Sequence, residues 1–287
     1  MSIKNILVAT DLSERSDRAM DRAVLLAKQM NATLHVVYVV DDEFSDVIAR
    51  AVEKNASAEL ERQMKDDPFF KGVKNNVCVA FGDPWRKIVD LTVALEADLV
   101  VLGTHRNRGI KELFRGTTLH RIAKFSRAPL LVAAERALVG YKNVLVGVDF
   151  SQCAAHAADL AAMISTNGQL TLVHAYHIPF KGLSAQMDID GDIPLREKQR
   201  IEREIEPKMN AFAASLHPST VKAKLEMVEG GPVEVLSNMA RKNKHDLICL
   251  GTHAKPWLVE TILGSTAFDM LSYPPSDVLI APLQKHG

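Results

Sequence analysis

An internal duplication constrains the fold of this chain more than any other feature of its 287 residues. The run Lys4–Val8 (KNILV) recurs as Lys142–Val146 (KNVLV), and Asp98–His105 (DLVVLGTH) recurs as Asp246–His253 (DLICLGTH). The offset is 138 residues at the first pair and 148 at the second, so the second copy carries a net insertion of about ten residues. Solenoid units span roughly 20–50 residues, so a repeat of this length is a whole duplicated domain.

Each copy alternates short apolar runs with segments whose apolar residues recur at helical spacing. Strands with almost no polar alternation are buried on both faces, and strand–helix alternation with such strands predicts a doubly wound parallel α/β sheet. We expect two five-stranded domains, over residues 1–137 and 141–287, joined by a short linker. The expected strands are 6–10, 34–40, 77–80, 99–102 and 130–133 in the first copy, and 144–148, 170–174, 225–228, 247–250 and 278–281 in the second. The insertion lies near residues 178–200, before an expected surface helix over 201–212.

Composition excludes several classes of protein. The 35 basic and 35 acidic side chains give no net charge, whereas nucleic-acid binding needs a surplus of Lys and Arg. No apolar run approaches the roughly 18 residues of a membrane helix. Three cysteines, odd in number and far apart, suit a reducing compartment. We therefore expect a cytoplasmic protein that binds neither nucleic acid nor membrane.

An aspartate follows the first expected strand of each copy, as Asp11 and as Asp149. Doubly wound sheets bind ligands beyond the carboxyl ends of their strands, where the strand order reverses. Each aspartate is therefore a candidate acceptor for a ligand hydroxyl or amine. The alternative is a local role as a helix N-cap or turn residue, because Asp followed by Ser commonly precedes a helix.

A glycine follows the fourth expected strand of each copy, in Gly103-Thr104-His105 and Gly251-Thr252-His253. Glycine lets the backbone pass close to a ligand or adopt a positive φ. The alternative is a tight turn between strand and loop. A turn alone does not easily explain why Thr and His recur in both copies.

The last helix of each copy opens with a glycine and hydroxyl residues, Gly116-Thr117-Thr118 and Gly264-Ser265-Thr266. Unpaired N–H groups and the helix dipole make such a position suitable for an anion. Simple capping of the helix by Thr or Ser is the alternative.

The loop before that helix differs in charge between the copies. Residues 104–115 carry a net charge of +3, whereas residues 252–263 carry none. A polyphosphate would be attracted to the first loop more than to the second; a solvated basic loop is the alternative. The charged residues of the first loop are Arg106, Arg108, Lys111, Glu112 and Arg115, and Gly109 lies among them.

These segments together resemble the universal stress protein family, and the resemblance covers nearly the whole chain as two copies of that domain. Nucleotide-binding members show the pattern G-x2-G-x9-G-[S/T] between the fourth strand and the last helix. Both copies match its spacing, and both replace its second glycine. The matching positions are Gly103, Arg106, Gly116 and Thr117 in the first copy, and Gly251, Ala254, Gly264 and Ser265 in the second.

The resemblance implies an adenine-nucleotide α-hydrolase-like fold and a stress-response protein that senses or carries ATP or AMP, with Mg²⁺ accompanying the nucleotide. Asp11 and Asp149 would lie near adenine and ribose, and Val39 or Ala175 near the base. The glycines and Thr117 or Ser265 would hold the phosphates. The last strands of the copies would pair, forming a pseudo-dimer within the chain; a further homodimer and an unknown protein partner stay open.

Two alternatives from other classes remain. One is a slow ATPase or nucleotidyl transferase, for which His105 is the one candidate base near the loop. The other is an interaction protein with degenerate sites, which the two replaced glycines favour. The chain lacks the G-x-x-x-x-G-K-[S/T] phosphate loop, the G-x-G-x-x-G dinucleotide turn and the G-x-S-x-G nucleophile elbow. We therefore expect binding, and neither a catalytic residue nor a metal site of the protein's own.

Overall fold

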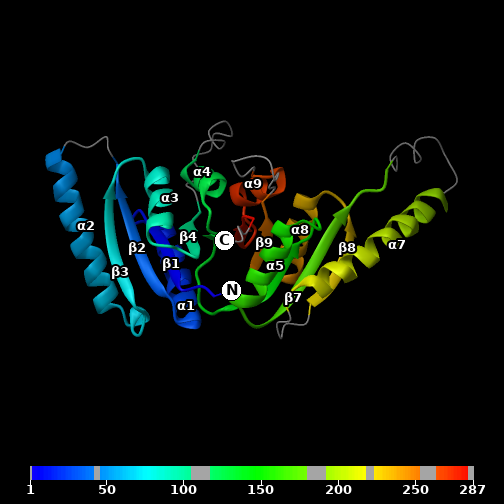
Figure 1. The fold of residues 1–287 in the computed structure, drawn as a ribbon, viewed down its shortest axis with the longest axis horizontal. Coiled ribbons are helices and arrows are strands. Elements are labelled where there is room, and N and C mark those ends of the chain that lie inside the picture. The colour runs from blue at the N-terminus through cyan, green and yellow to red at the C-terminus, as the bar shows by residue number, and fades with distance from the viewer. Residues whose placement is uncertain are drawn as a thin grey trace. The chain divides into compact units, whose positions relative to one another are not determined.

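The computed structural model describes residues 2–41, 46–104, 117–179, 192–217, 223–252 and 263–283. The chain forms two compact units, which Figure 1 shows as labelled ribbons. Unit 1 comprises Met1–Gly140 and Thr252–Pro282, and unit 2 comprises Tyr141–Gly251 and Leu283–Gly287. The units therefore divide the chain differently from the sequence repeats, because the end of the second repeat belongs to unit 1.

Unit 1 is built on a sheet with the strand order β3-β2-β1-β4-β5-β10. Its first five strands are parallel, and the last is antiparallel to its neighbour. The strands are β1 (Asn5–Thr10), β2 (Thr33–Val40), β3 (Asn75–Phe81), β4 (Leu99–Gly103), β5 (Leu130–Ala133) and β10 (Asp277–Ala281). The helices are α1 (Glu14–Met30), α2 (Asp46–Asp66), η1 (Pro68–Phe70), α3 (Pro84–Ala94), α4 (Thr118–Phe125) and α9 (Ser265–Ser272).

Unit 2 has a parallel sheet in the order β9-β6-β7-β8. Its strands are β6 (Tyr141–Gly147), β7 (Ser165–Tyr176), β8 (Ala223–Glu229) and β9 (Leu247–Gly251). Its helices are α5 (Gln152–Ile164), α7 (Asp192–Ser215) and α8 (Pro232–Asn243). All ten expected strands occur, and the parallel α/β class is confirmed.

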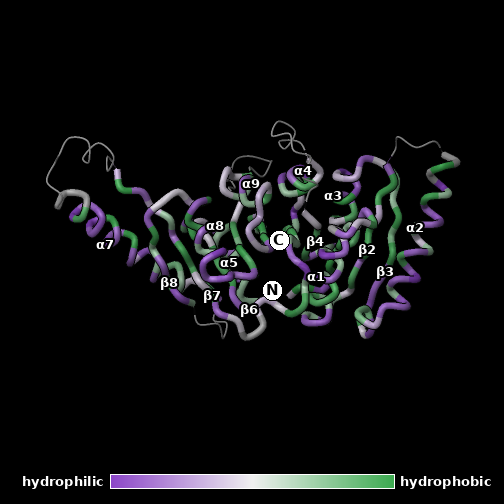
Figure 2. The backbone as a smooth tube through the Cα atoms, turned by 180° about the vertical axis from the view of Figure 1, so that it is seen from behind, coloured by the Kyte–Doolittle hydropathy of each residue, from purple (hydrophilic) through white to green (hydrophobic). Residues whose placement is uncertain are grey.

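The apolar runs form the core of each unit. Every residue of β5 and β10 is buried, as expected for strands covered on both faces. Figure 2 shows hydrophobic residues concentrated along strands such as β2, whereas hydrophobic and hydrophilic residues alternate along α2 and α7. On α1, the apolar residues Ala19, Ala23 and Leu26 recur at helical spacing and are buried.

The helix between β7 and β8, α7, takes the place that α2 has in the first repeat. It begins at Asp192, inside the stretch 178–200 and before the expected start at Ile201. Ile205, Met209 and Phe212 form its buried face, whereas other positions are exposed, as expected of an amphipathic surface helix. The Tyr176 hydroxyl of β7 donates to Glu202 Oε1 at 2.6 Å, and burial together with this carboxylate raises the pKa of Tyr176. One face of α7 is therefore fastened to the sheet of unit 2.

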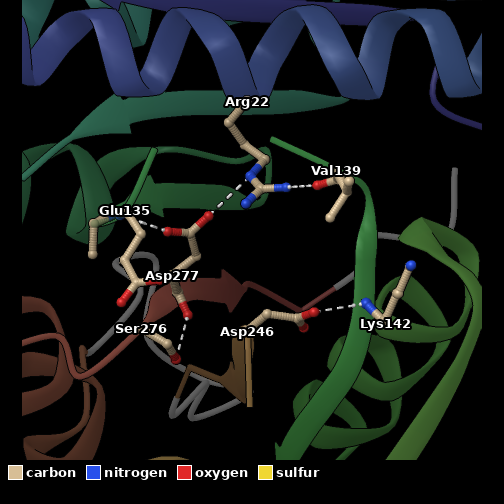
Figure 3. A network of polar contacts seen from close by, with 8 residues as sticks. Arg22, Glu135, Val139, Lys142, Asp246, Ser276 and Asp277 are labelled. Carbon is tan, nitrogen blue, oxygen red and sulfur yellow. Dashed lines mark hydrogen bonds and ion pairs between the residues drawn. The ribbon is translucent and has the colours of Figure 1, made fainter. Parts of the chain in front are cut away.

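The recurring Asn and Asp of the two repeats have a structural role. The Asp98 carboxylate accepts from the backbone N–H groups of Lys4 and Asn5 at 2.7 and 2.9 Å. In unit 2, Asp246 accepts from Lys142 N at 2.8 Å and from Asn143 N at 3.1 Å (Figure 3). In each unit, the aspartate that precedes the fourth strand of the repeat thus accepts hydrogen bonds from backbone N–H groups at the start of the first strand. These repeated residues need no ligand to explain them.

The last strands of the two repeats pair inside unit 1, as the family resemblance implied. Leu279 of β10 lies opposite Leu131 of β5 in an antiparallel register. β10, which comes from the second repeat, therefore extends the sheet of the first repeat beyond β5.

A buried ion pair accompanies this strand pairing. Arg22 Nε on α1 donates to Asp277 Oδ2 at 2.9 Å, and the two side chains are 6% and 1% exposed. Arg22 also donates to the Val139 carbonyl at 2.9 Å, while Asp277 Oδ1 accepts from Ala134 N at 2.8 Å and Glu135 N at 3.2 Å. Figure 3 shows how this network joins α1, β10 and the linker after β5. The network fixes the chain segment between the repeats.

The duplication does not repeat this ion pair. The residue equivalent to Arg22 in the second repeat is the buried Leu160, and the residue equivalent to Asp277 in the first is Pro129. Both residues of the ion pair are thus replaced at the equivalent positions of the other repeat, so each repeat supplies one partner that the other repeat lacks. Since an unpaired buried charge is unfavourable, Arg22 selects the strand that carries Asp277.

We predict that Arg22→Met lowers the free energy of unfolding by about 3–5 kcal/mol, because Asp277 is then buried without its cation. Urea unfolding followed by circular dichroism measures the loss. Arg62→Met is the control, since the exposed pair of Arg62 with Glu59 contributes below about 1 kcal/mol. Equal losses in the two variants would contradict the role of the buried pair.

Two partly buried histidines predict a loss of stability in mild acid. Burial lowers the pKa of His35 and of His245 from the ordinary value of 6.5. The unfolded chain therefore binds protons more readily than the native state, so stability is full above about pH 7.5 and falls toward about pH 5.5. Urea unfolding across this range measures the slope. His35→Gln combined with His245→Gln should flatten it, whereas His177→Gln, at an exposed position, should leave it unchanged.

Candidate functional site

The strand order of unit 1 reverses between β1 and β4. From β1 the chain continues outward to β2 and β3, and then crosses to β4 on the other side of β1. Asp11 follows the carboxyl end of β1, and Gly103 ends β4. The sheet thus brings these two predicted residues to its switch point, where ligands of doubly wound folds bind.

Asp11 lies in a tight turn between β1 and α1. Its Oδ1 accepts from Ser13 N at 3.1 Å, and the Ser13 hydroxyl donates to the same oxygen. The N-cap of α1 is Ser13, so the N-cap interpretation of Asp11 was wrong and the turn interpretation was right. In unit 2, Asp149 Oδ1 likewise accepts from Ser151 N at 3.0 Å, and Ser151 caps α5. Both aspartates are exposed to solvent.

The residue after each aspartate has a strained backbone. Leu12 and Phe150 have φ values of 59° and 63°, in the left-handed region that non-glycine residues rarely adopt. Such a residue costs of order 1–2 kcal/mol, and such strain clusters at functional sites. The Leu12 N–H is satisfied by Thr10 Oγ1 at 3.0 Å. Sequence reasoning missed the positive φ in these turns, since neither Leu nor Phe signals one.

The glycine of β9 has a steric role. A Cβ added to Gly251 would lie 2.5 Å from the carbonyl carbon of Cys153 and 2.6 Å from the backbone nitrogen of Ala154. The end of β9 therefore passes directly against the start of α5, where a side chain cannot fit. This packing explains Gly251 without a ligand.

Thr117 caps α4, and its hydroxyl also contacts a buried histidine. Its side chain accepts from the His120 backbone N–H, and Thr117 Oγ1 lies 2.7 Å from His120 Nδ1. His120 Nε2 lies 3.1 Å from the Ser272 hydroxyl of α9, and the His120 ring packs on Phe268 with centroids 4.2 Å apart. Sequence reasoning missed His120, whose one signal is its position three residues after a capping threonine.

The donors in this chain of hydrogen bonds can be assigned. Ser272 Oγ donates to the Phe268 carbonyl at 2.9 Å, so it accepts from His120 Nε2. In the neutral ring, Nδ1 then accepts the hydrogen of the Thr117 hydroxyl. That hydroxyl is engaged within unit 1, whereas the N–H groups of Thr118 and Leu119, in the first turn of α4, have no carbonyl partner in their own helix.

The remaining predicted residues divide into three groups. Val39 lies near the end of β2, beyond the last residue pair with β1, and Ala175 has the same place on β7. The candidates of the second copy are divided between the units. Asp149 and Gly251 belong to unit 2. The start of α9 belongs to unit 1, with Gly264 as the N-cap and Ser265 and Thr266 in the first turn. The others lie outside the described residues: His105, Arg106, Arg108, Gly109, Lys111, Glu112, Arg115, Gly116, His253 and Ala254.

In the described part of the chain, no group of three or more His, Cys, Asp or Glu side chains is arranged to hold a metal ion. None of the helices in those ranges combines the length and the apolar character needed to cross a bilayer.

Comparison with known proteins identifies the family. The model of the universal stress protein family matches residues 2–134 and again residues 140–282. The chain belongs to the universal stress protein family. Its two matches confirm the tandem arrangement that the duplication predicted. The family is thereby established for both repeats, including the segment of the second repeat that folds into unit 1.

Relatives and solved structures agree with this assignment. Universal stress protein YxiE of Bacillus subtilis is 30% identical over 143 residues, covering 44% of this chain and 96% of YxiE. The universal stress protein structure from Archaeoglobus fulgidus has a TM-score of 0.69 at 18% identity and covers 98% of both chains. PA1789 of Pseudomonas aeruginosa, a protein described as functionally unknown, also reaches a TM-score of 0.69, at 20% identity over 98% of this chain and 92% of its own. The last two likenesses support the fold of the whole tandem chain.

We predict that Gly251→Ala destabilises the protein by about 1–3 kcal/mol, because the added methyl group overlaps the backbone of α5. Gly231→Ala is the matched control, since a Cβ at Gly231 meets nothing within 4 Å and φ there is −70°. Thermal and urea unfolding of both variants measure the difference. A Gly251→Ala protein as stable as wild type would show that the packing at this glycine is looser than described.

Proposed function

We propose that the first repeat binds an adenine nucleotide at the carboxyl ends of β1 and β4, and that this universal stress protein acts as a nucleotide sensor or carrier. One observation carries the proposal: the strand order of unit 1 reverses between β1, which Asp11 follows, and β4, which ends at Gly103. The candidate site residues of the first repeat all belong to unit 1, whereas those of the second repeat are divided between units 1 and 2. This difference favours the first repeat as the binding repeat.

The described residues fit a nucleotide in three respects. The exposed Asp11 carboxylate is an acceptor for ribose hydroxyls, while Ser13 and the turn hold it in place. Val39 offers an apolar contact for the base beyond the end of β1. The N–H groups of Thr118 and Leu119 and the dipole of α4 suit phosphate oxygens. Because the Thr117 hydroxyl is engaged by His120, its contribution would be to hold this helix start in place.

The described groups favour binding over turnover. His120 Nδ1 accepts from Thr117, so this histidine is not poised to activate a water. Mg²⁺ would arrive with the nucleotide phosphates, since these residues offer no protein cage for it. A slow ATPase and a degenerate interaction protein remain the competing functions.

We predict that ATP binds the wild-type protein and that Asp11→Asn weakens binding about tenfold or more. Asparagine keeps an oxygen for the turn but loses the charged acceptor, which is worth about 1.5 kcal/mol or more. Isothermal titration calorimetry with MgATP measures the affinity. Asp149→Asn is the matched control, because it makes the same change in the same turn of the second repeat.

Several outcomes separate the competing functions. Equal effects of the two variants would contradict a site in the first repeat alone. No heat with ATP or AMP, at any magnesium concentration, would favour the degenerate interaction protein. Steady phosphate release that Thr117→Ala abolishes would favour the ATPase. Melting temperatures of all variants exclude a folding defect as the cause.

A further inference from the structure

Helices α3 and α4 of unit 1 lie side by side (Figure 1). Cationic and aromatic side chains cluster between them. The rings of Trp85 and Phe125 pack with their centroids 5.2 Å apart. The guanidinium groups of Arg86 and Arg121 lie 5.3 and 5.6 Å from the Trp85 centroid, and Lys124 Nζ lies 5.0 Å from that of Phe125. We call these five residues the Trp85 patch. Stacking on the rings holds the cations in defined positions.

The Trp85 patch faces solvent. The Arg86 side chain is 70% exposed, Phe125 is 37% exposed, and Arg121 is also exposed. The Asp83 carboxylate lies 3.7 Å from Arg86 Nε, an exposed contact of small energy. The buried Trp85 Nε1 has no hydrogen-bond partner among the described residues. The patch therefore presents a surplus of positive charge on an aromatic base.

The fold does not require this charge. At the equivalent positions, 148 residues later, the second repeat carries Glu234 for Arg86 and Asp269 for Arg121. It also replaces Trp85 by Val233. The same elements, α8 and α9, form with the opposite charge, so the cations of the first repeat serve something other than folding.

We propose that the Trp85 patch is a docking site for an acidic segment of another protein, one that carries at least two carboxylates and an apolar side chain. Arginine guanidinium groups bind carboxylates in bidentate fashion, and stacked guanidinium groups are preorganised for it. The exposed Phe125 ring provides the apolar contact. Nucleic acid fits less well, because its bases need open aromatic faces and both arginines already lie over Trp85.

This surface uses other groups than the proposed nucleotide site. Its side chains come from the start of α3 and from residues 121–125 of α4, whereas the proposed site uses the N–H groups of Thr118 and Leu119 and the carboxyl ends of β1 and β4. The proposal therefore goes beyond nucleotide binding and gives the first repeat a protein partner of defined chemistry.

The test uses the full chain and fluorescein-labelled poly-L-glutamate as the acidic probe, with anisotropy as the readout. The variant Arg86→Glu with Arg121→Asp installs the residues that the second repeat tolerates. The control, Lys71→Glu with Lys74→Asp, makes the same change of charge at exposed positions before β3, at the other end of that strand. We expect the dissociation constant to rise at least about tenfold in the first variant and to change little in the control.

A second readout locates the contact. The chain has two tryptophans, Trp85 and Trp257, so Trp257→Phe leaves Trp85 as the sole emitter. Binding at the patch should shift Trp85 emission, and added salt should reverse the shift. Equal losses in both charge variants, or binding without a change in Trp85 emission, would overturn the proposal.

Two competing occupants give different results. A single-stranded oligothymidylate that binds more tightly than polyglutamate, and that also depends on Arg86 and Arg121, would make the patch a nucleic-acid surface. Self-association in sedimentation velocity that Arg86→Glu with Arg121→Asp abolishes would assign the patch to a second copy of the chain. Either result would overturn docking of an acidic partner. The melting temperature of the double variant shows whether it folds.

Discussion

The buried contact between Arg22 and Asp277 is the constraint on which the organisation of unit 1 depends. It joins α1 to β10 across 255 residues of sequence, and its two partners also hold the linker at Ala134, Glu135 and Val139. Two desolvated charges stabilise a structure only when they meet, so the pair penalises any arrangement that separates them. The strand pairing of β5 with β10 supplies hydrophobic burial, and the ion pair determines which strand occupies that edge.

The duplication has preserved the frame of the domain and changed its surface. Three features recur in both repeats. They are the aspartate that accepts hydrogen bonds from the neighbouring strand, the strained turn after the first strand, and the glycine that ends the fourth strand. These features are conditions for folding in this topology. Charge behaves differently: the basic loop and the Trp85 patch occur in the first repeat alone. The residues that differ between the repeats are thus better guides to function here than the residues that recur.

Much of the fold followed from sequence, because the strands are nearly unbroken apolar runs and the duplication shows each twice. The switch-point position of Asp11 and Gly103 followed from the same pattern. The rest depends on contacts that no local pattern encodes. The pairing of Arg22 with Asp277, the hydrogen bonds of His120 across to α9 and the positive φ of Leu12 are set by tertiary structure. Gly251 was read as a ligand contact, whereas its neighbour is the backbone of α5.

The place of β10 in unit 1 has a consequence for synthesis of the chain. A domain made of contiguous sequence can fold as soon as it leaves the ribosome. Unit 1 cannot be completed in this way, because β10 and the partner of Arg22 are made only after the whole of β6 to β9. Until then the nascent first repeat presents an open strand edge at β5 and an arginine without Asp277, and synthesis of β10 supplies both partners at once.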